Sequence, residues 1–425
     1  MPAGPRAGVF CSGPQRVMTK KQILFVDDEP EFLQALQDSF RIVEPGWATS
    51  LATGGAEGLD LVRKGRFDVV VADLQMPGMD GVTFLSKVQE LQPSTMRFLL
   101  SGNLEQQDVL RLAAPTHQCF TKPLNMDLLR QTIRRLCALR DLLGNDVLRR
   151  LVAQCSILPT VPTLYLELAK ELQSPMASVE RVEAIVCKDP AVTAKILQLV
   201  NSSFFGLARR IESLGEAIHY VGLNIIKALV LTVPVYSRFD GVRVRDYSPV
   251  AIWEHCWRTG VLARAISLEE RQSPALCEEA FLAGLLHDLG KMVLVANLSS
   301  LCREATAAAQ RAHISMHQAE REVFGCTHSM VAAYLLGLWG LPESLVEAVA
   351  FHNEPMEAPS SSFTSLTAVH VSNALDHAYS EGKPEHFKDL VDLEYLMSLG
   401  LPARIPDWQR VGLAAFQRTR QASGE

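Results

Sequence analysis

The chain has no long apolar run and no signal-peptide core. Its most membrane-like segment, Ala228–Val235, is short and contains Pro234, whereas about 20 apolar residues are needed to cross a bilayer. Residues 1–19 carry Gly, Pro and Arg, so we expect a disordered tail, or a segment upstream of a true start at Met18. These absences predict no membrane association.

Two further absences concern charge and cysteine pairing. The net charge is −6 with no lysine-rich tail, which disfavours nucleic acid as a partner. The nine cysteines include no Cys-x-x-Cys pair, so we expect no disulfide framework and a cytoplasmic location. With 425 residues, 48% of them hydrophobic, the chain is long enough for two or three domains.

Residues 20–124 alternate short apolar runs with amphipathic helical patterns, which predicts a parallel sheet with crossover helices. The expected strands are Gln22–Val26, Trp47–Ala52, Phe67–Ala72, Met96–Leu100 and Cys119–Phe120. The expected helices are Glu31–Phe40, Ala56–Arg63, Val82–Leu91 and Glu105–Ala113. The pattern is that of a doubly wound, five-stranded α/β domain.

The expected strands end in residues suited to a charged ligand. These residues are Asp27, Asp28, Asp73, Ser101 and Lys122. Ligands of open α/β sheets bind beyond the carboxyl ends of the strands. Three carboxylates gathered there repel one another unless a hard cation such as Mg²⁺ joins them. A lone aspartate at a strand end is usually a cap or turn residue, but five matching positions favour a binding site.

These positions resemble the receiver domain of bacterial two-component response regulators. The motifs that carry the resemblance are Val26–Glu29, Asp73–Gly81, Ser101-Gly102 and Thr121–Pro123. The resemblance implies that Asp73 accepts a phosphoryl group from a histidine kinase or phosphotransfer protein. It further implies a magnesium site formed by Asp27, Asp28, Asp73 and the Gln75 carbonyl. The phosphoryl contacts and the switch are implied to involve Ser101 and Lys122.

One position departs from the receiver pattern. The family usually has an aromatic switch residue three places before the lysine, where this chain has Cys119. Phe120 follows, and strand alternation predicts that it faces the opposite side.

Residues 125–150 are expected to form a connecting helix. Leucines and Ile133 at three- and four-residue spacing give Met126–Leu143 an apolar face. Four arginines, among them Arg140, lie on the other face, which we expect to be solvated. Self-pairing in a homodimer stays open, because three heptads are too few to decide it.

From Leu151 onward the pattern is helix after helix, which predicts an all-α domain. Several motifs resemble the HDOD domain, an all-helical relative of HD-type metal phosphohydrolases in bacterial signalling proteins. They are Ile157–Pro162, Lys188–Leu197, Asn201–Gly206, Ser213–Ile218, Gly284–Gly290 and Trp339–Pro342. The resemblance assigns residues 151–355 to an HDOD domain and leaves 356–425 as a C-terminal helical extension.

Within Phe281–Lys291, an apolar helix leads to the His287–Asp288 pair and is expected to break at Gly290. Alone, such a pair is more often a hydrogen-bonded core pair than a metal site. The resemblance to HD-type enzymes implies a divalent metal site of Mn, Fe or Zn. Its matching positions are His255, His287, Asp288, His328, His352 and Asn373.

Asn373 stands where the pattern has its closing aspartate, and an amide coordinates only as a neutral carbonyl. Asp376, one helical turn later, is a weak substitute. Most HDOD domains lack a complete set and are regarded as non-catalytic. Four further histidines are expected to be ordinary surface or helix residues: His313, His317, His370 and His377.

Two functions follow. The leading hypothesis is a phospho-regulated response regulator that signals by protein contact to an unidentified downstream protein through a non-catalytic HDOD domain. The alternative is an enzyme, a phospho-regulated metal phosphohydrolase acting on nucleotides or cyclic dinucleotides, in which Lys291 steadies a phosphate or is simply solvated. A DNA-binding regulator has little support, because the second domain has no basic helix-turn-helix.

Overall fold

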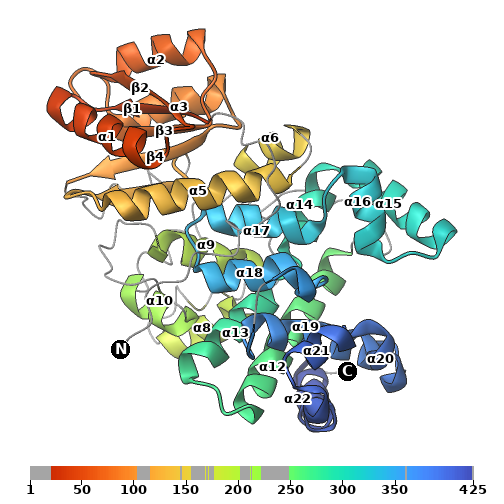
Figure 1. The fold of residues 1–425 in the computed structure, drawn as a ribbon. Coiled ribbons are helices and arrows are strands. Elements are labelled where there is room, and N and C mark those ends of the chain that lie inside the picture. Colours follow the sequence, from red (N-terminus) through yellow and green to blue (C-terminus); the bar gives the residue numbers. More distant parts are fainter. Residues whose placement is uncertain are drawn as a thin grey trace. The chain divides into compact units, whose positions relative to one another are not determined.

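The computed structural model describes residues 21–102, 115–143, 146–154, 168, 171, 177–201, 211, 213–221, 248–358 and 361–423 (Figure 1). Some expected features lie wholly or mostly outside these residues: the tail at 1–19, the helix Glu105–Ala113, and the motifs Ile157–Pro162 and Asn201–Gly206. The chain divides into two compact units. The first comprises Met1–Ser156, Gln198–Arg210 and Tyr334–Leu341, and the second comprises the remainder.

The first unit contains a five-stranded parallel sheet, which confirms the predicted α/β architecture. Its strands are β1 (Gln22–Val26), β2 (Ala48–Ala52), β3 (Val69–Asp73), β4 (Met96–Ser101) and β5 (Gln118–Thr121), in the order β2-β1-β3-β4-β5. Because the order reverses after β2, the chain leaves β1 and β3 toward opposite neighbours. In doubly wound sheets, such a reversal opens a crevice at the carboxyl ends of the two strands, and ligands bind there.

Helices cover both faces of this sheet. They are α1 (Pro30–Val43), α2 (Gly55–Lys64), α3 (Gly81–Leu91) and α5 (Met126–Leu142), followed by α6 (Asp146–Gln154). Alternate residues of β1 point to different layers. Leu24 and Val26 join the core with Phe84 of α3, whereas the Phe25 ring lies 5.2 Å from the Phe40 ring of α1. The two-residue period of the strands thus builds a separate core on each face.

The prediction of a solvated arginine face on α5 is wrong at Arg140. Its side chain is only 8% exposed, and its guanidinium lies 2.5 Å from the Asp68 carboxylate. Arg134 pairs with Glu44, and Arg130 donates to the Ser39 hydroxyl. The sequence of α5 shows which residues are polar. It cannot show that carboxylates elsewhere in the unit form ion pairs with them.

The first unit also includes Tyr334–Leu341, a segment distant in sequence. The Gln118 amide donates a hydrogen bond of 2.9 Å to the Gly337 carbonyl. A Cβ atom at position 337 would approach the Leu139 side chain to 2.7 Å and that of Leu136 to 3.2 Å. Glycine at this position therefore permits close contact with α5.

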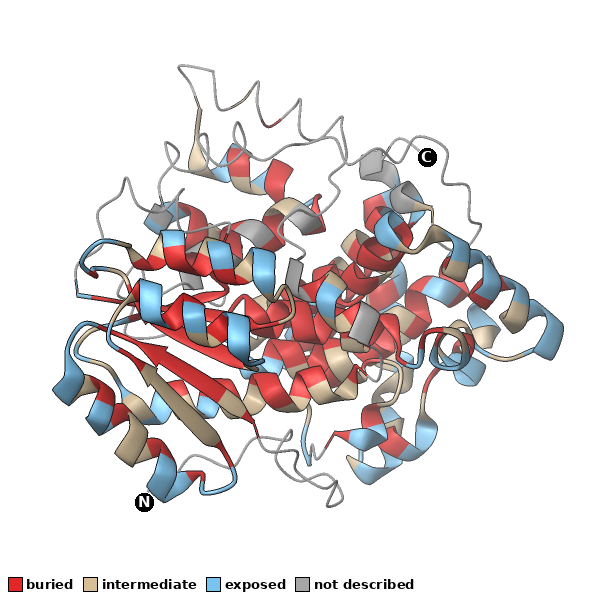
Figure 2. Cartoon of the chain, turned by 90° about the horizontal axis from the view of Figure 1, so that it is seen from above, coloured by how far each residue is buried: buried red, intermediate tan, exposed pale blue. Residues whose placement is uncertain are grey.

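The second unit is helical, as predicted. Its helices are α8 (Val179–Val186), α9 (Pro190–Asn201), α10 (Leu214–Val221), α12 (Pro249–Glu269), α13 (Pro274–Leu286), α14 (Leu289–Asn297), α15 (Ser299–Ala312), α16 (Met316–Phe324), α17 (His328–Leu338), α18 (Glu343–Phe351), α19 (Ser365–Ser380), α20 (Phe387–Leu390), α21 (Leu393–Ser398) and α22 (Ile405–Ser423). Some of these helices cross a unit boundary at one end. Figure 2 shows buried residues along the inward faces of the helices and exposed residues along the outward faces.

Glycines set the closest helix contacts of the second unit. A Cβ atom at Gly284 of α13 would stand 2.8 Å from the Gly260 Cα of α12. A Cβ atom at Gly290 would stand 1.9 Å from the His328 carbonyl oxygen. The expected helix break at Gly290 is therefore wrong: the break falls at His287–Asp288, and Gly290 lies inside α14, where it lets this helix touch α17.

The C-terminal extension belongs to the core of the second unit. Tyr395, Leu396 and Trp408 are fully buried, in one cluster with Leu262 of α12. The Trp408 indole donates a hydrogen bond of 2.8 Å to Glu270. Among the described helices, none is by itself long and apolar enough to span a membrane; the bent pair Pro274–Asn297 and Ser299–Ala312 passes by length and composition alone.

Candidate functional site

The first candidate site lies at the carboxyl edge of the sheet. Asp27 follows β1, Asp73 ends β3 and Lys122 follows β5, so parallel pairing brings all three together. The Lys122 ammonium lies 2.8 Å from the Asp27 carboxylate and 2.6 Å from that of Asp73. Both carboxylates are buried, whereas Asp28 is exposed. Ser101 is buried at the end of β4.

Backbone groups hold these carboxylates in place. The Gln75 amide donates 2.7 Å to Asp73, and the Glu29 amide donates 2.9 Å to Asp27. A Cβ atom at Gly81 would lie 2.2 Å from the Asp73 carbonyl oxygen, so only glycine fits there. Burial raises the pKa of Asp73 against the opposing effect of Lys122. One ammonium thus serves two buried carboxylates, and this acidic excess suits a hard cation such as Mg²⁺.

At the position of the usual aromatic switch, Cys119 is buried in the core cluster that contains Leu99. Burial raises the pKa of its thiol to about 12. The ring of the next residue, Phe120, lies 5.6 Å from that of Phe98. Cys119 and Phe120 therefore pack in different surroundings, as strand alternation predicts.

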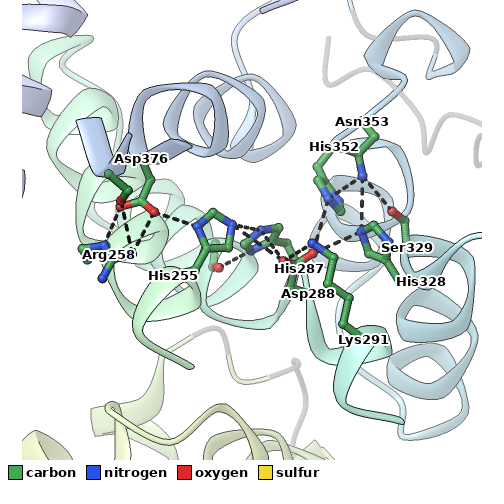
Figure 3. Close-up of polar contacts among 12 residues, drawn as sticks. His255, Arg258, His287, Asp288, Lys291, His328, Ser329, His352, Asn353 and Asp376 are labelled. Atoms are coloured by element: carbon green, nitrogen blue, oxygen red, sulfur yellow. Dashed lines mark hydrogen bonds and ion pairs between the residues drawn. The ribbon is translucent and has the colours of Figure 1, made fainter. Parts of the chain in front are cut away.

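The second candidate site is a buried cluster formed by five of the six predicted HD-type positions (Figure 3). They come from five places in the fold: His255 from α12, His287 from the end of α13, Asp288 from the turn before α14, His328 from the start of α17 and His352 from the end of α18. Two ligand sets share Asp288. One contains His255 and His287, and the other contains His328 and His352.

Each imidazole is oriented by a hydrogen bond from Nδ1. His255 donates to Asp376 at 2.7 Å, and His328 donates to Glu320 at 2.6 Å. The remaining two donate to the backbone carbonyl three residues earlier: His287 to Gly284 at 2.7 Å and His352 to Val349 at 2.9 Å. Each Nε2 is left for the cluster. Metal-binding histidines are typically oriented in this way by a carboxylate or a carbonyl.

Electrostatics favour the protonation states that metal ligands need at His287, His352 and Asp288, but not at His328. Burial lowers the pKa of His287 to about 4 and that of His352 well below its usual range. Burial opposes ionisation of Asp288, but the Lys291 ammonium and the neighbouring imidazoles of His287 and His328 together outweigh it, and the pKa of this carboxyl lies well below its usual range. Burial alone would lower the pKa of His328, yet the carboxylates of Glu320 and Asp288 together reverse the effect and raise it.

Polar residues around the cluster occupy some of its atoms. The Lys291 ammonium lies 2.7 Å from Asp288, and its side chain is 15% exposed, so the option of a simply solvated lysine is wrong. The Asn353 amide nitrogen lies 2.8 Å from His352 Nε2. Arg258 donates to Asp376 at 2.7 Å. Asp376 therefore orients His255 and is itself paired with Arg258.

Asn373 differs from the other five predicted positions. It lies on α19 and, with His255 and Asp288, lines a cavity of about 710 Å³. Its side-chain oxygen is buried and, within the described residues, has no hydrogen-bond partner. Figure 3 shows the contacts among the other five positions and their neighbours.

Two further histidines, which the sequence predicts to be ordinary surface or helix residues, lie in helices and make specific polar contacts. His370 is buried; its Nδ1 donates 2.8 Å to the His352 carbonyl, and its Nε2 accepts from the Asp392 amide. His317 is 12% exposed and pairs with Glu354. His377 is exposed, although its ring lies 4.6 Å from that of His255. Glu320 and Asn353 were not anticipated; the only local signal is that Asn353 adjoins a predicted ligand.

Comparisons with known proteins follow the two units. The chain matches the response regulator receiver domain model over residues 23–134 and the HDOD domain model over residues 158–355. Sporulation initiation phosphotransferase F of Bacillus subtilis is 31% identical over 127 residues, which are 29% of this chain and 99% of that protein. An uncharacterized protein of Treponema pallidum is 24% identical over 257 residues, 60% of this chain and 47% of that protein.

Among solved structures, the MmoQ response regulator of Methylococcus capsulatus is 22% identical, with a TM-score of 0.46 over 60% of this chain and 98% of that one. The chain covers about half of the Treponema protein but nearly all of the Bacillus phosphotransferase. The receiver domain model and the Bacillus phosphotransferase match the part of the chain that contains the parallel sheet. The HDOD domain model matches the helical part. The chain belongs to the two-component response regulators that join a receiver domain to an HDOD domain.

Proposed function

We propose that Asp73 accepts a phosphoryl group from a histidine kinase or phosphotransfer protein. The observation that carries this proposal is the Lys122 ammonium within 2.8 Å of both Asp27 and Asp73. An Asp73 carboxylate oxygen attacks phosphorus, a P–O bond forms, and the P–N bond to the donor's histidine breaks. Lys122 offsets negative charge on the transferring group.

The site has the ligands that a magnesium ion would need. Asp27, Asp28, Asp73 and the Gln75 carbonyl are the residues that would hold it, and oxygen ligands of this kind suit Mg²⁺. When bound, the ion neutralises charge on the phosphoryl oxygens. Ser101, at the end of β4, supplies a hydroxyl donor to the phosphorylated state.

The signal leaves the receiver through β5 and α5. Both elements contact Gly337 inside the first unit, where Gln118 donates to its carbonyl and the Leu139 side chain packs against it. Phosphorylation would shift a two-state equilibrium of the receiver, and these contacts would bias the helices that carry the HDOD motifs. The output is a protein contact with a downstream partner, in the cytoplasm and without nucleic acid or membrane. The sedimentation experiment described next also measures whether the chain forms a homodimer.

The test compares wild type with Asp73→Asn, incubated with acetyl phosphate and Mg²⁺. Sedimentation velocity reports the oligomeric state. Affinity capture, with the amount of each co-purified protein measured, reports partner binding. Wild type should change in one of these readouts on phosphorylation, whereas Asp73→Asn should not. Identical behaviour of the two proteins under phosphorylating conditions contradicts the proposal.

A metal phosphohydrolase is the second candidate, favoured by the convergence of five predicted ligands on one buried cluster. His255, His287, Asp288, His328 and His352 would hold the metal, which would supply an activated water. The neutral Asn373 weakens this candidate. Turnover of a phosphodiester or cyclic dinucleotide by metal-loaded protein, lost in Asp288→Asn, would support it, and no turnover with Mn, Fe or Zn would eliminate it.

A further inference from the structure

The C-terminal extension keeps a group of large apolar side chains in contact with solvent. Its other apolar residues complete the helical core: Phe387, Leu396 and Trp408 are fully buried in the cluster that contains Leu262. The exposed group, which we call the apolar patch, consists of Met356, Leu390, Leu393 and Met397. Met397 is the most exposed of the four, at 65%. Folding of the extension therefore does not account for these four side chains.

The members of the patch lie close together in the fold. Leu393 and Met397 are one turn apart on α21, so they share a face of this helix. Met356 lies in η4 (Pro355–Glu357), a 3-10 helix that contacts α21. Leu390 ends α20, three residues before Leu393. Exposed apolar residues scattered singly are ordinary, whereas a group of them in one place marks an interaction surface.

Exposed carboxylates border the patch. Three of the four patch residues have an exposed acidic neighbour in the chain, and we call these neighbours the acidic rim: Glu357, Asp389 and Glu394. In the part of the chain that the structure describes, none of the three forms an ion pair. Residues 381–394 as a whole carry five carboxylates and two lysines. The patch is thus an apolar surface in a negatively charged setting.

The acidic rim determines which class of partner fits the patch. A second copy that used the same patch would bring like charges together, and a membrane surface carries negative lipid headgroups, so both are disfavoured. A partner with Lys or Arg beside its apolar residues is attracted instead. Leu393 and Met397 at helical spacing form a ridge for packing, and methionine side chains adapt to the shape of an amphipathic helix.

We propose that the apolar patch docks an amphipathic helix of a downstream protein, one that carries Lys or Arg beside its apolar residues. The inference rests on the proposed output by protein contact, for which it names the surface and the chemistry of the partner. The patch lies beyond residue 355, where the match to the HDOD domain model ends. The C-terminal extension, rather than the HDOD motifs, would therefore choose the partner.

The test uses two fluorescent model helices that differ only in charge. One is an amphipathic helix of Leu and Lys, and the other has Glu at every Lys position. Fluorescence anisotropy measures the Kd of each helix for the full-length chain. Wild type should bind the basic helix at least about tenfold more tightly than the acidic helix, because several rim charges contribute. Equal affinities, or no binding of the basic helix, would overturn the proposal.

Charge reversal gives a result that a folding defect cannot imitate. Asp389→Lys combined with Glu394→Lys should weaken binding of the basic helix about tenfold and strengthen binding of the acidic helix. The matched control is Asp60→Lys with Glu304→Lys, which changes the net charge equally at exposed positions of α2 and α15. The control should keep the wild-type preference, because distant charges are screened by salt. Equal shifts in the two double variants would overturn the proposal.

A second matched pair isolates the apolar contact. Met397→Gln keeps the length of the side chain and should weaken binding of the basic helix about tenfold. Ile42→Gln changes an equally exposed residue of α1 and should leave the affinity unchanged. Equal effects of the two variants would overturn the proposal. Sedimentation velocity adds one more outcome: self-association of wild type that Met397→Gln abolishes would assign the patch to a second copy and overturn the proposal.

Failure of this inference is distinguishable from failure of the proposed function. Circular dichroism melts show that the variants fold. Each binding measurement is made with and without acetyl phosphate and Mg²⁺, and hydrogen exchange of α17 and α19 is followed on the same samples. Selective binding at the patch without any exchange response to the phosphoryl group would contradict only the receiver proposal. An exchange response without selective binding at the patch would contradict only this inference.

Discussion

A single methyl group at position 290 tests how the histidine cluster is assembled. The Cβ atom of Gly290→Ala would stand 1.9 Å from the His328 carbonyl oxygen and 3.1 Å from the Ala332 amide nitrogen. An ordinary C···O contact is about 3.3–3.6 Å, so α14 and α17 would have to separate by about 1.5 Å. Both neighbouring atoms are backbone atoms of a helix, and neither can rotate away.

The expected cost follows from two opposing effects. Overpacking of this kind destabilises by about 1–3 kcal/mol and occasionally more, whereas alanine replacing a helical glycine gains about 1 kcal/mol. Because the clash is with backbone, we place the first effect at its upper end and expect a net loss of about 2 kcal/mol. The separation should also move His328 away from Asp288 and disturb the cluster.

Gly412→Ala is the matched control. Position 412 also lies in a helix, α22, but its Cβ atom would meet the tip of the Leu375 side chain at 2.9 Å, which can rotate aside. We expect its stability to lie within about 1 kcal/mol of wild type. Urea unfolding of both variants provides the comparison. If Gly290→Ala is as stable as Gly412→Ala, the close approach of α14 to α17 is not what holds this site.

Three further changes give distinct outcomes. Asp376→Asn weakens the orientation of His255 and should lower zinc affinity about 10–100-fold by calorimetry; unchanged affinity would exclude that role. Arg140→Ala breaks a largely buried ion pair and should lower the free energy of unfolding in urea by about 2 kcal/mol. Arg63→Ala, in an exposed pair, should lower it by about 0.5 kcal/mol or less, and equal losses would contradict this prediction. Burial raises the pKa of Glu347 from 4.5 to about 7, so the stability that its neutral form gives is lost as pH rises across that interval. Glu347→Gln should therefore raise the Tm at pH 8 by an amount that vanishes as the pH falls toward 4.5, and a pH-independent gain would refute this.

The sequence predicts the sheet and its acidic edge well, because both depend on local patterns. Short apolar runs that alternate with helical patterns favour buried parallel strands, and parallel pairing then brings Asp27, Asp73 and Lys122 to one edge. The histidine cluster is predictable for a different reason: its motifs resemble those of a known family, although their positions span nearly a hundred residues.

The partners of these residues could not be predicted. Asp376 is 121 residues from His255, and nothing in the local pattern distinguishes an orienting carboxylate from a failed ligand. His370 looks like any helical histidine until its two hydrogen bonds are seen. Gly290 reads as a helix breaker, but its role is to admit the His328 backbone. Such roles depend on packing between distant segments, which spacing along the chain does not encode.

The central claim is that phosphorylation of Asp73 changes the helical output domain. Hydrogen exchange of α17 and α19, measured with and without acetyl phosphate and Mg²⁺, tests it most directly. The account predicts altered protection of these helices in wild type and none in Asp73→Asn. Unchanged protection of both helices in wild type that carries the phosphoryl group would contradict it.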